Sequence, residues 1–253
     1  MSDKAINSDR INILLTGATR GLGLFLAKRL HEANFRVIGL DLPAHDELSQ
    51  EAKDQLEGYY SFDLTHINDI KSLISRIISE NQHIDILINN AGLKSFRKLE
   101  DYETGDFSKV MDVNFMAPAL LSKEVAVYMA RQNYGRIIHI ASNAGFEGYS
   151  KGTAYCSSKG ALHLFTQAYS KELPGSVTIN AVSPSSLSSL EPAALTGTPA
   201  PGSLIDPARV FTSITRIINS GVTGQVIPII SLRDKLGYLY RDMRKHFTWL
   251  TKY

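Results

Sequence analysis

The residues best suited to chemistry form the short run Tyr155-Cys156-Ser157-Ser158-Lys159, at the start of a segment whose pattern predicts a helix. Residues four apart share one helical face, so we expect Tyr155 and Lys159 to act together. A nearby ammonium lowers the pKa of a phenol from about 10, which makes the tyrosine a usable general acid–base. Ser142 follows a predicted strand and can hold a substrate carbonyl oxygen while Tyr155 protonates it. Because this spacing is common by chance, its meaning depends on the surrounding sequence.

A glycine-rich turn is the second chemical feature. Residues 16–23 read Thr-Gly-Ala-Thr-Arg-Gly-Leu-Gly and join a predicted strand to a predicted helix. Glycines let the backbone approach a ligand, and free N–H groups at the helix start attract an anion such as a pyrophosphate. A purely structural strand–helix turn is the alternative. Asp41 ends the next predicted strand, where a carboxylate can accept the ribose hydroxyls of an adenosine and repel a 2′-phosphate. This pair of features predicts NAD as cofactor, in preference to NADP.

The elements that must position these residues are short apolar runs alternating with helical patterns. Predicted strands occupy 11–15, 35–40, 59–62, 84–88, 136–141 and 177–182, and predicted helices occupy 22–33, 67–78, 110–131 and 155–173. Strands separated by helices form parallel sheets with right-handed crossovers. We therefore predict an α/β fold: a single-domain, Rossmann-like, doubly wound parallel sheet with helices on both faces.

One dinucleotide-binding and catalytic domain is expected over residues 1–253, with three special segments. Residues 1–10 form a polar N-terminal tail. Residues 185–207 are rich in Ser, Pro, Gly and Thr, which is typical of a substrate flap or a disordered loop. Residues 232–253 form a basic amphipathic C-terminal extension. This extension predicts a helix packed on its own domain or on a neighbouring subunit, an element at a membrane surface or acidic partner, or a frayed tail.

Composition excludes several classes of protein. The net charge of the 253 residues is only +2, which argues against a nucleic-acid binder driven by bulk charge. The single cysteine, Cys156, cannot form an internal disulfide, and the seven histidines lack metal-ligand spacing, so no metal site is expected. No apolar run approaches the roughly 18 residues of a membrane span, and residues 1–10 lack the apolar core of a signal peptide. These features favour a cytoplasmic protein.

Taken together, these motifs resemble the short-chain dehydrogenase/reductase family, in its single-domain form of about 250 residues. The resemblance covers residues 10–231 and lies in Gly17, Gly21 and Gly23, Asp41, Asp63-Leu64, Asn89-Asn90-Ala91-Gly92, Asn114, Ser142, Tyr155 and Lys159. It implies an oxidoreductase that transfers a hydride between NAD(H) and a carbonyl or secondary alcohol. The cofactor supplies the hydride and the protein supplies geometry and electrostatics.

The resemblance also implies individual roles. The catalytic residues would be Asn114, Ser142, Tyr155 and Lys159, with Asn114 holding a water that links Lys159 to solvent. Asp63 would bind the adenine amino group with the Leu64 backbone beside it, and Lys159 would bind the nicotinamide ribose. The full implied cofactor set is Gly17, Thr19, Arg20, Gly21, Leu22, Gly23, Asp41, Asp63, Leu64, Asn90, Ala91, Gly92, Tyr155, Lys159, Pro184 and Ser188.

Departures from the family pattern leave alternatives open. Arg20 is similar to a feature of NADP-preferring relatives, whereas Asp41 favours NAD. After Pro184 the usual glycine is replaced by Ser185, and Ser188 stands where a threonine is expected. A non-catalytic nucleotide-binding regulator or scaffold is therefore an alternative, whereas an epimerase would need a longer C-terminal domain. The expected partners are a small-molecule carbonyl or alcohol and further copies of the chain, as a homodimer or homotetramer; the substrate itself is not readable.

Overall fold

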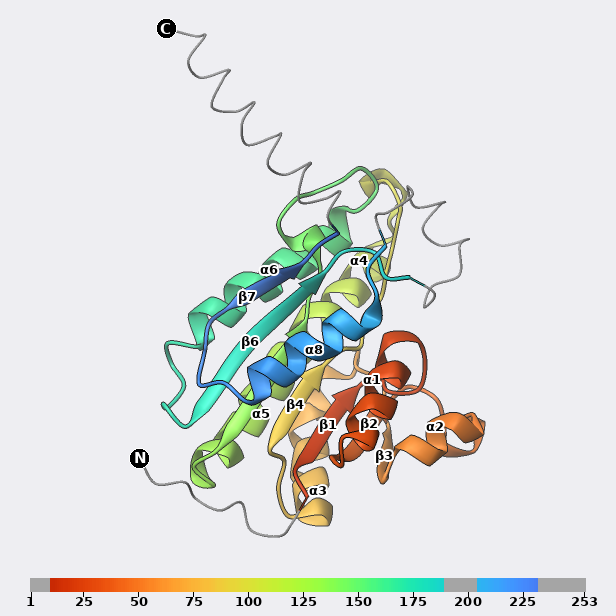
Figure 1. Cartoon of the computed structure of the whole chain (residues 1–253). Coiled ribbons are helices and arrows are strands. Elements are labelled where there is room, and N and C mark those ends of the chain that lie inside the picture. Colours follow the sequence, from red (N-terminus) through yellow and green to blue (C-terminus); the bar gives the residue numbers. More distant parts are fainter. Residues whose placement is uncertain (1–9, 189–203, 232–253) are drawn as a thin grey trace, which may run out of the picture.

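The fold is built on a parallel sheet, seen in a computed structural model that describes residues 10–188 and 204–231 (Figure 1). Among the described residues seven strands pair in the order β3-β2-β1-β4-β5-β6-β7, all parallel. Their bounds are β1 Asn12–Thr16, β2 Arg36–Asp41, β3 Gly58–Ser61, β4 Ile86–Asn89, β5 Gly135–Ile140, β6 Val177–Pro184 and β7 Val226–Ile229. The predicted doubly wound α/β fold is confirmed.

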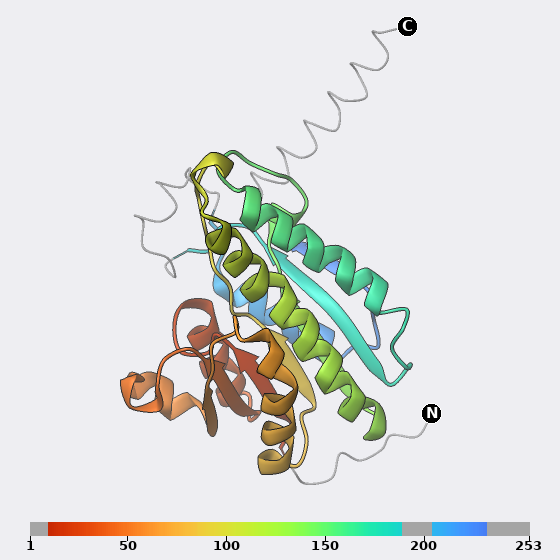
Figure 2. The same ribbon diagram turned by 180° about the vertical axis from the view of Figure 1, so that it is seen from behind.

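Helices cover both faces of this sheet. On one face lie α1 (Gly21–Glu32) and α8 (Pro207–Ile218), which contact each other (Figure 1). On the other face lie α3 (Ile70–Asn81), α4 (Thr104–Met111), α5 (Ala117–Arg131) and α6 (Thr153–Tyr169) (Figure 2). Because the sheet is covered twice, its central strands are apolar on both sides: β1 and β4 are buried along their whole length.

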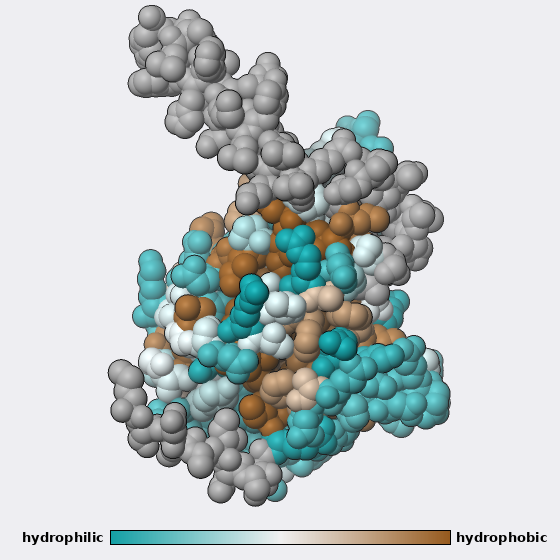
Figure 3. All heavy atoms as spheres, viewed as in Figure 1, coloured by the Kyte–Doolittle hydropathy of each residue, from teal (hydrophilic) through white to brown (hydrophobic). Residues whose placement is uncertain are grey.

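The core accordingly falls into two main clusters, one on each face. Leu14, Leu87 and Ile137 point toward α3 and α5, whereas Ile13, Ile86 and Ile138 point toward α1 and α8. Successive strand residues face opposite sides, which is why neighbouring residues of one strand belong to different clusters. Hydrophilic residues gather around α2 (Gln50–Gln55), at the edge of the molecule (Figure 3).

The helix predicted over 110–131 is interrupted. Residues Asp112–Met116 form a π-helical segment between α4 and α5. Pro118, in the first turn of α5, explains the interruption. A proline has no N–H to donate to the carbonyl four residues earlier, and its ring clashes with that carbonyl. The carbonyl concerned belongs to Asn114, so the break falls on a residue of the predicted site.

Helices α2 and α8 are additional to the predicted set, and α4 begins at Thr104, six residues before the start of the helix predicted over 110–131. Helix α8 has clear signals in the sequence: Asp206 accepts a hydrogen bond from Ala208 N, Pro207 occupies its first turn, and Val210, Ile214 and Ile217 form a buried stripe. The other, α2, is a short helix of 6 residues whose first turn is capped by Ser49. Most of the N-terminal tail, residues 189–203 of the flap and the whole C-terminal extension lie outside the described residues. Within the described part, no helix is long and apolar enough to span a membrane.

Candidate active site

The predicted site residues converge on one edge of the sheet, where the parallel strands end. The glycine-rich turn follows β1, Asp41 ends β2, Asn90 follows β4 and Ser142 follows β5. Open parallel sheets bind ligands outside the carboxyl ends of their strands. The order of the strands therefore brings together residues that lie more than a hundred positions apart in the chain.

The glycine-rich turn is tightly packed against the start of the loop after β4. Gly17 has φ +65°, and a Cβ there would lie 2.9 Å from Ala91 Cα. A Cβ on Gly23 would lie 1.7 Å from the carbonyl oxygen of Gly17, so α1 can begin this close to the turn only with glycine. Asn90 Nδ2 donates to the carbonyl oxygens of Thr16 (3.0 Å) and Gly17 (3.1 Å). The backbone is thereby held open at the N-terminus of α1, as a pyrophosphate site requires.

Asp41 holds the turn from the other side. Its Oδ2 accepts hydrogen bonds from Thr19 N (3.0 Å) and Thr19 Oγ1 (2.7 Å), and its Oδ1 accepts from Leu42 N (2.8 Å). Thr19 therefore contacts Asp41, a link that the sequence did not suggest. A carboxylate offers about four acceptor positions, so these three hydrogen bonds leave Asp41 about one position for a ribose hydroxyl.

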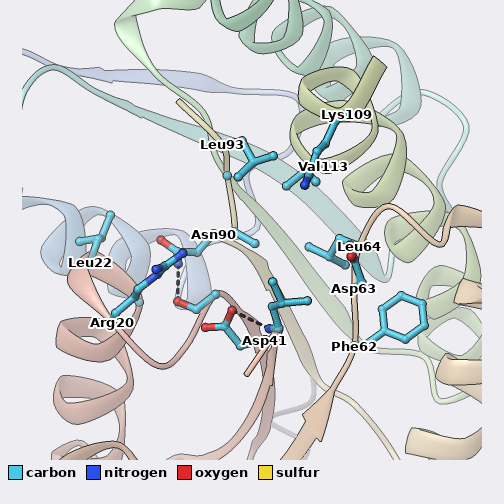
Figure 4. Close-up of a pocket in the computed structure, with 15 residues that line it drawn as sticks. Arg20, Leu22, Asp41, Phe62, Asp63, Leu64, Asn90, Leu93, Lys109 and Val113 are labelled. Carbon is cyan, nitrogen blue, oxygen red and sulfur yellow. Dashed lines mark hydrogen bonds between the residues drawn. The ribbon is translucent and has the colours of Figure 1, made fainter. Parts of the chain in front are cut away.

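A cavity of about 290 Å³ lies between these elements (Figure 4). Arg20 and Asn90 lie on one side, Phe62, Asp63 and Leu64 on the opposite side, with Asp41 between them (Figure 4). Ten of the predicted cofactor residues line it: Gly17, Arg20, Leu22, Gly23, Asp41, Asp63, Leu64, Asn90, Ala91 and Gly92. Further lining residues were not predicted, namely Leu42, Phe62, Leu93, Lys109 and Val113. These shapes and donors fit a dinucleotide: a glycine cradle at one end, a carboxylate in the middle and apolar side chains around Asp63.

Asp63 is organised by its own turn. Its Oδ1 accepts from Thr65 N (2.9 Å) and Thr65 Oγ1 (2.8 Å). These two hydrogen bonds hold the pKa of the Asp63 carboxyl below its usual value, against a smaller opposing effect of burial. The group is therefore a charged acceptor near neutral pH, suited to an amino group.

Tyr155 and Lys159 lie on α6 and are both buried, at 7% and 4% exposure. The Lys159 Nζ atom lies 5.8 Å from the centroid of the Tyr155 ring, and it donates a hydrogen bond to the carbonyl oxygen of Ile140 (2.9 Å). Burial, and secondarily the neighbouring Lys94, lower the pKa of Lys159 to about 8. Lys159 is thus mostly charged at pH 7, although the low-dielectric surroundings oppose that charge.

Gly92 joins the cavity to this pair. It lines the cavity, and a Cβ there would lie 3.7 Å from Lys159 Nζ and 3.3 Å from Asn114 Oδ1. Lys159 and Asn114 therefore lie close to the Gly92 end of the cavity, although Asn114, Tyr155 and Lys159 do not themselves line it.

Asn114 is buried in the π-helical segment, and its side chain is fully engaged. Its Oδ1 accepts from Leu93 N (2.7 Å), while its Nδ2 donates to Leu93 O (2.9 Å) and to Ser158 Oγ (3.1 Å). The side chain thus ties the loop after β4 to α6. Pro118 has no N–H to donate to the backbone carbonyl of Asn114, which lies four residues earlier in the chain.

Ser142 stands at the start of a short turn, Asn143–Gly145, between β5 and α6. Its Oγ accepts a hydrogen bond from Ala144 N (3.2 Å), which leaves its proton available to a substrate oxygen. Beyond it, the Phe96 ring lies 6.3 Å from the Tyr155 ring and 6.1 Å from the Tyr149 ring. Aromatic side chains therefore stand beside Tyr155.

Pro184 and Ser188 lie further along the same edge. Pro184 is the last residue of β6 and pairs with Ile229. Ser188 donates from both its N (2.8 Å) and its Oγ (3.2 Å) to the carbonyl of Ile205. Neither residue lines the cavity described above, and the hydrogen bonds of Ser188 join the two described ends of the flap.

Comparisons with known proteins agree with this geometry. A family model described as short chain dehydrogenase matches residues 12–191. A 3-oxoacyl-(acyl-carrier-protein) reductase of Rickettsia prowazekii is 33% identical over 172 residues, which cover 68% of this chain and 70% of the relative. A 2-dehydro-3-deoxy-D-gluconate 5-dehydrogenase of Formosa agariphila is 32% identical over 177 residues, covering 68% and 67%.

Solved structures share the fold. A 4-hydroxyisoleucine dehydrogenase complexed with NADH has a TM-score of 0.78 at 26% identity, covering 87% of this chain and 97% of its own. ElxO with NADP bound has a TM-score of 0.77 at 24% identity, with the same coverage. The two similar folds thus hold different nicotinamide cofactors.

Proposed function

The chain belongs to the short-chain dehydrogenase family and is a nicotinamide-dependent oxidoreductase; from that premise we propose that it uses NAD(H), with Tyr155 as general acid–base, to interconvert a carbonyl and a secondary alcohol. The observation that supports this most is the position of Gly92. That residue borders both the cofactor cavity and Lys159, so a nicotinamide seated there would lie beside α6.

When bound, the nicotinamide supplies a hydride to the substrate carbon in reduction and accepts it in oxidation. In reduction, Tyr155 donates its phenolic proton to the carbonyl oxygen, and in oxidation its phenolate takes that proton back. Ser142 donates a hydrogen bond to the same oxygen and orients it. The Lys159 ammonium, held by the Ile140 carbonyl, favours the phenolate by its charge and offers its remaining protons to the ribose hydroxyls.

Asn114 contributes through two groups. Its side chain holds the loop after β4 at a fixed distance from α6. Its backbone carbonyl holds a water that passes protons between Lys159 and solvent. Pro118, four residues later, has no N–H to donate to this carbonyl, which supports that role.

The preference for NAD rests on Asp41. A 2′-phosphate beside a carboxylate is repelled, and Asp41 is fixed in place by Thr19. Arg20 also lines the cavity and is exposed, so it can turn toward solvent. Since the relatives with solved structures bind either cofactor, the charge at Asp41 is the local feature that supports NAD over NADP in this proposal.

Titration of nicotinamide fluorescence tests this preference. We expect NADH to bind at least about tenfold more tightly than NADPH, which corresponds to about 1.4 kcal/mol. Asp41→Asn, which keeps the shape but removes the charge, is expected to narrow that ratio, whereas the exposed change Asp54→Asn in α2 leaves it unchanged. Equal or reversed affinities in the unmodified protein would refute the assignment of Asp41.

A screen of carbonyls and alcohols, followed by nicotinamide absorbance with both cofactors, tests turnover. Oxidation or reduction of at least one compound is expected, and binding of cofactor without any turnover would favour a regulator or scaffold.

We also propose a homodimer or homotetramer, because Val127 of α5 and Leu164 of α6 are exposed apolar residues on the long helices. Light scattering that detects only monomer at micromolar concentration would contradict that assembly.

A further inference from the structure

His163 is a buried histidine of α6 that has no role in the chemistry described above. It lies one helical turn after Lys159 and is 6% exposed. Its Nε2 atom is 2.8 Å from Ser183 Oγ in β6, and Ser183 is completely buried. The imidazole therefore connects the helix that carries Tyr155 to the strand that ends at Pro184.

The same imidazole is packed against the turn that follows Ser142. A Cβ on Gly145 would lie 2.5 Å from His163 Cε1 and 2.8 Å from His163 Nδ1. The Phe146 ring lies against the imidazole, with ring centroids 4.4 Å apart. Any side chain at position 145 would collide with the imidazole, so the Gly145 backbone packs directly against the ring.

The two ring nitrogens have different partners. Burial, and next the Lys159 ammonium, lower the pKa of His163 to about 4, while a hydrogen bond with the Gly145 backbone raises it. A backbone hydrogen bond raises a histidine pKa when a ring N–H donates to a carbonyl oxygen. His163 is therefore neutral at pH 7, and the tautomer that suits both partners has Nδ1–H donating to the Gly145 carbonyl and Nε2 accepting from the Ser183 hydroxyl.

We propose that His163 is a positioning residue that clamps the Ser142 turn to β6 and thereby fixes the Ser142 hydroxyl for its substrate oxygen. The Ser142 side chain is coupled to this turn, because its Oγ accepts from Ala144 N and its carbonyl accepts from Gly145 N (3.0 Å). Movement of Gly145 away from the imidazole would therefore change the direction of the Ser142 hydroxyl. This inference rests on the proposed function, which gives Ser142 its task.

Hydrogen–deuterium exchange of the full chain tests the clamp without substrate or cofactor. In His163→Leu, which removes both hydrogen bonds, the amides of Ala144, Gly145 and Phe146 are expected to exchange at least about tenfold faster. His163→Gln is expected to restore part of the protection, because its amide group can donate and accept. The matched control is Thr166→Val, a buried position of α6 whose hydroxyl bonds to the Leu162 carbonyl of its own helix; it should leave this turn unchanged.

Ser183→Ala covers the case in which the leucine variant does not fold. It leaves the imidazole in place but removes one of its partners, and a smaller increase, about threefold, is expected in the same amides. Unchanged exchange of the turn in Ser183→Ala and in His163→Gln, or in His163→Leu where it folds, would overturn the clamp.

Kinetics with a compound found in the screen tests the route through Ser142. His163→Gln is expected to lower kcat about tenfold while KM for NAD(H) stays within about twofold, because small misplacements of an orienting group cost rate. In a Ser142→Ala background the same change should have no further effect, and multiplicative losses would refute that route. Full activity of Tyr155→Phe would instead refute the proposed function, and the exchange result would still decide the clamp.

Discussion

The cofactor side and the catalytic side of this site hold their polar groups in different ways. On the cofactor side, Asp41 and Asp63 are half-buried carboxylates that accept hydrogen bonds from backbone N–H groups close by in sequence or in the adjoining turn. On the catalytic side, Lys159 and His163 of α6 and His139 of β5 are buried, and burial is the largest cause of the lowered pKa of each. Hydrogen bonds from backbone amides therefore organise the cofactor side, whereas burial away from water sets the pKa values of the catalytic side.

This difference means that removal of charge should affect the two sides in opposite ways. On the cofactor side, charge and backbone shape support binding and stability together. On the catalytic side, charge supports the reaction but opposes folding, because a buried ammonium loses its hydration.

The largest effect is expected from Lys159→Met. Loss of the ammonium should lower kcat about 10³-fold, within the usual range for acid–base catalysis. The free energy of unfolding should stay within about 1 kcal/mol of the original or rise, because methionine fills a similar volume without a buried charge. Steady-state kinetics and chemical denaturation measure the two quantities. The control is Lys123→Met, whose side chain is 65% exposed, and a large loss of stability with unchanged kcat in Lys159→Met would reverse the assignment.

A smaller effect, on binding, is expected from Gly23→Ala. The new Cβ would collide with the Gly17 carbonyl oxygen, so the turn must move and NADH affinity should fall about 100-fold. Gly175→Ala is the matched control, because a Cβ there meets nothing within 4 Å. Isothermal titration with NADH measures both variants, and equal affinities would show that the cradle does not bind the cofactor.

Acid is expected to lower the free energy of unfolding through the buried histidines of the catalytic side. Burial lowers the pKa of His139 to about 3 and that of His163 to about 4, from 6.5. Between pH 6.5 and about 4 the unfolded chain therefore binds protons that the folded chain refuses. As the pH falls through this range, the free energy of unfolding should decrease by up to about 1.4 kcal/mol per pH unit for each histidine. Burial raises the pKa of Asp85, so protonation of that carboxyl acts in the opposite sense.

Denaturation measured across this pH range checks the slope. His139→Gln and His163→Gln should each make it shallower, whereas the exposed control His66→Gln should keep it unchanged. If neither His139→Gln nor His163→Gln changes the slope of the free energy of unfolding against pH, groups other than these histidines cause the sensitivity to acid.

The cofactor side was also the more predictable from sequence. Its features are local: glycines before a helix, a carboxylate at the end of the next strand, and Asp63 with Thr65 two positions on. The spacing of Tyr155 and Lys159 is likewise a property of one helix, and the structure gives them the expected common face.

The other features needed the fold. Pairing of His163 with Ser183 spans two elements and depends on the register of β6, which a single sequence does not fix. The engagement of Asn114 with Leu93 depends on a π-helical segment that the apolar pattern of residues 110–131 does not indicate. Helix α8 is a different case, since its cap, its proline and its apolar stripe are all local features of the sequence.

The most direct test of the central claim compares Tyr155→Phe with the original chain, using a carbonyl or alcohol identified by the screen. If Tyr155 transfers the proton, kcat should fall at least about 10²-fold while the Kd for NADH stays within about twofold. Tyr169→Phe, which removes a hydroxyl from the end of the same helix, should change neither. A Tyr155→Phe protein that keeps its full turnover would contradict the account.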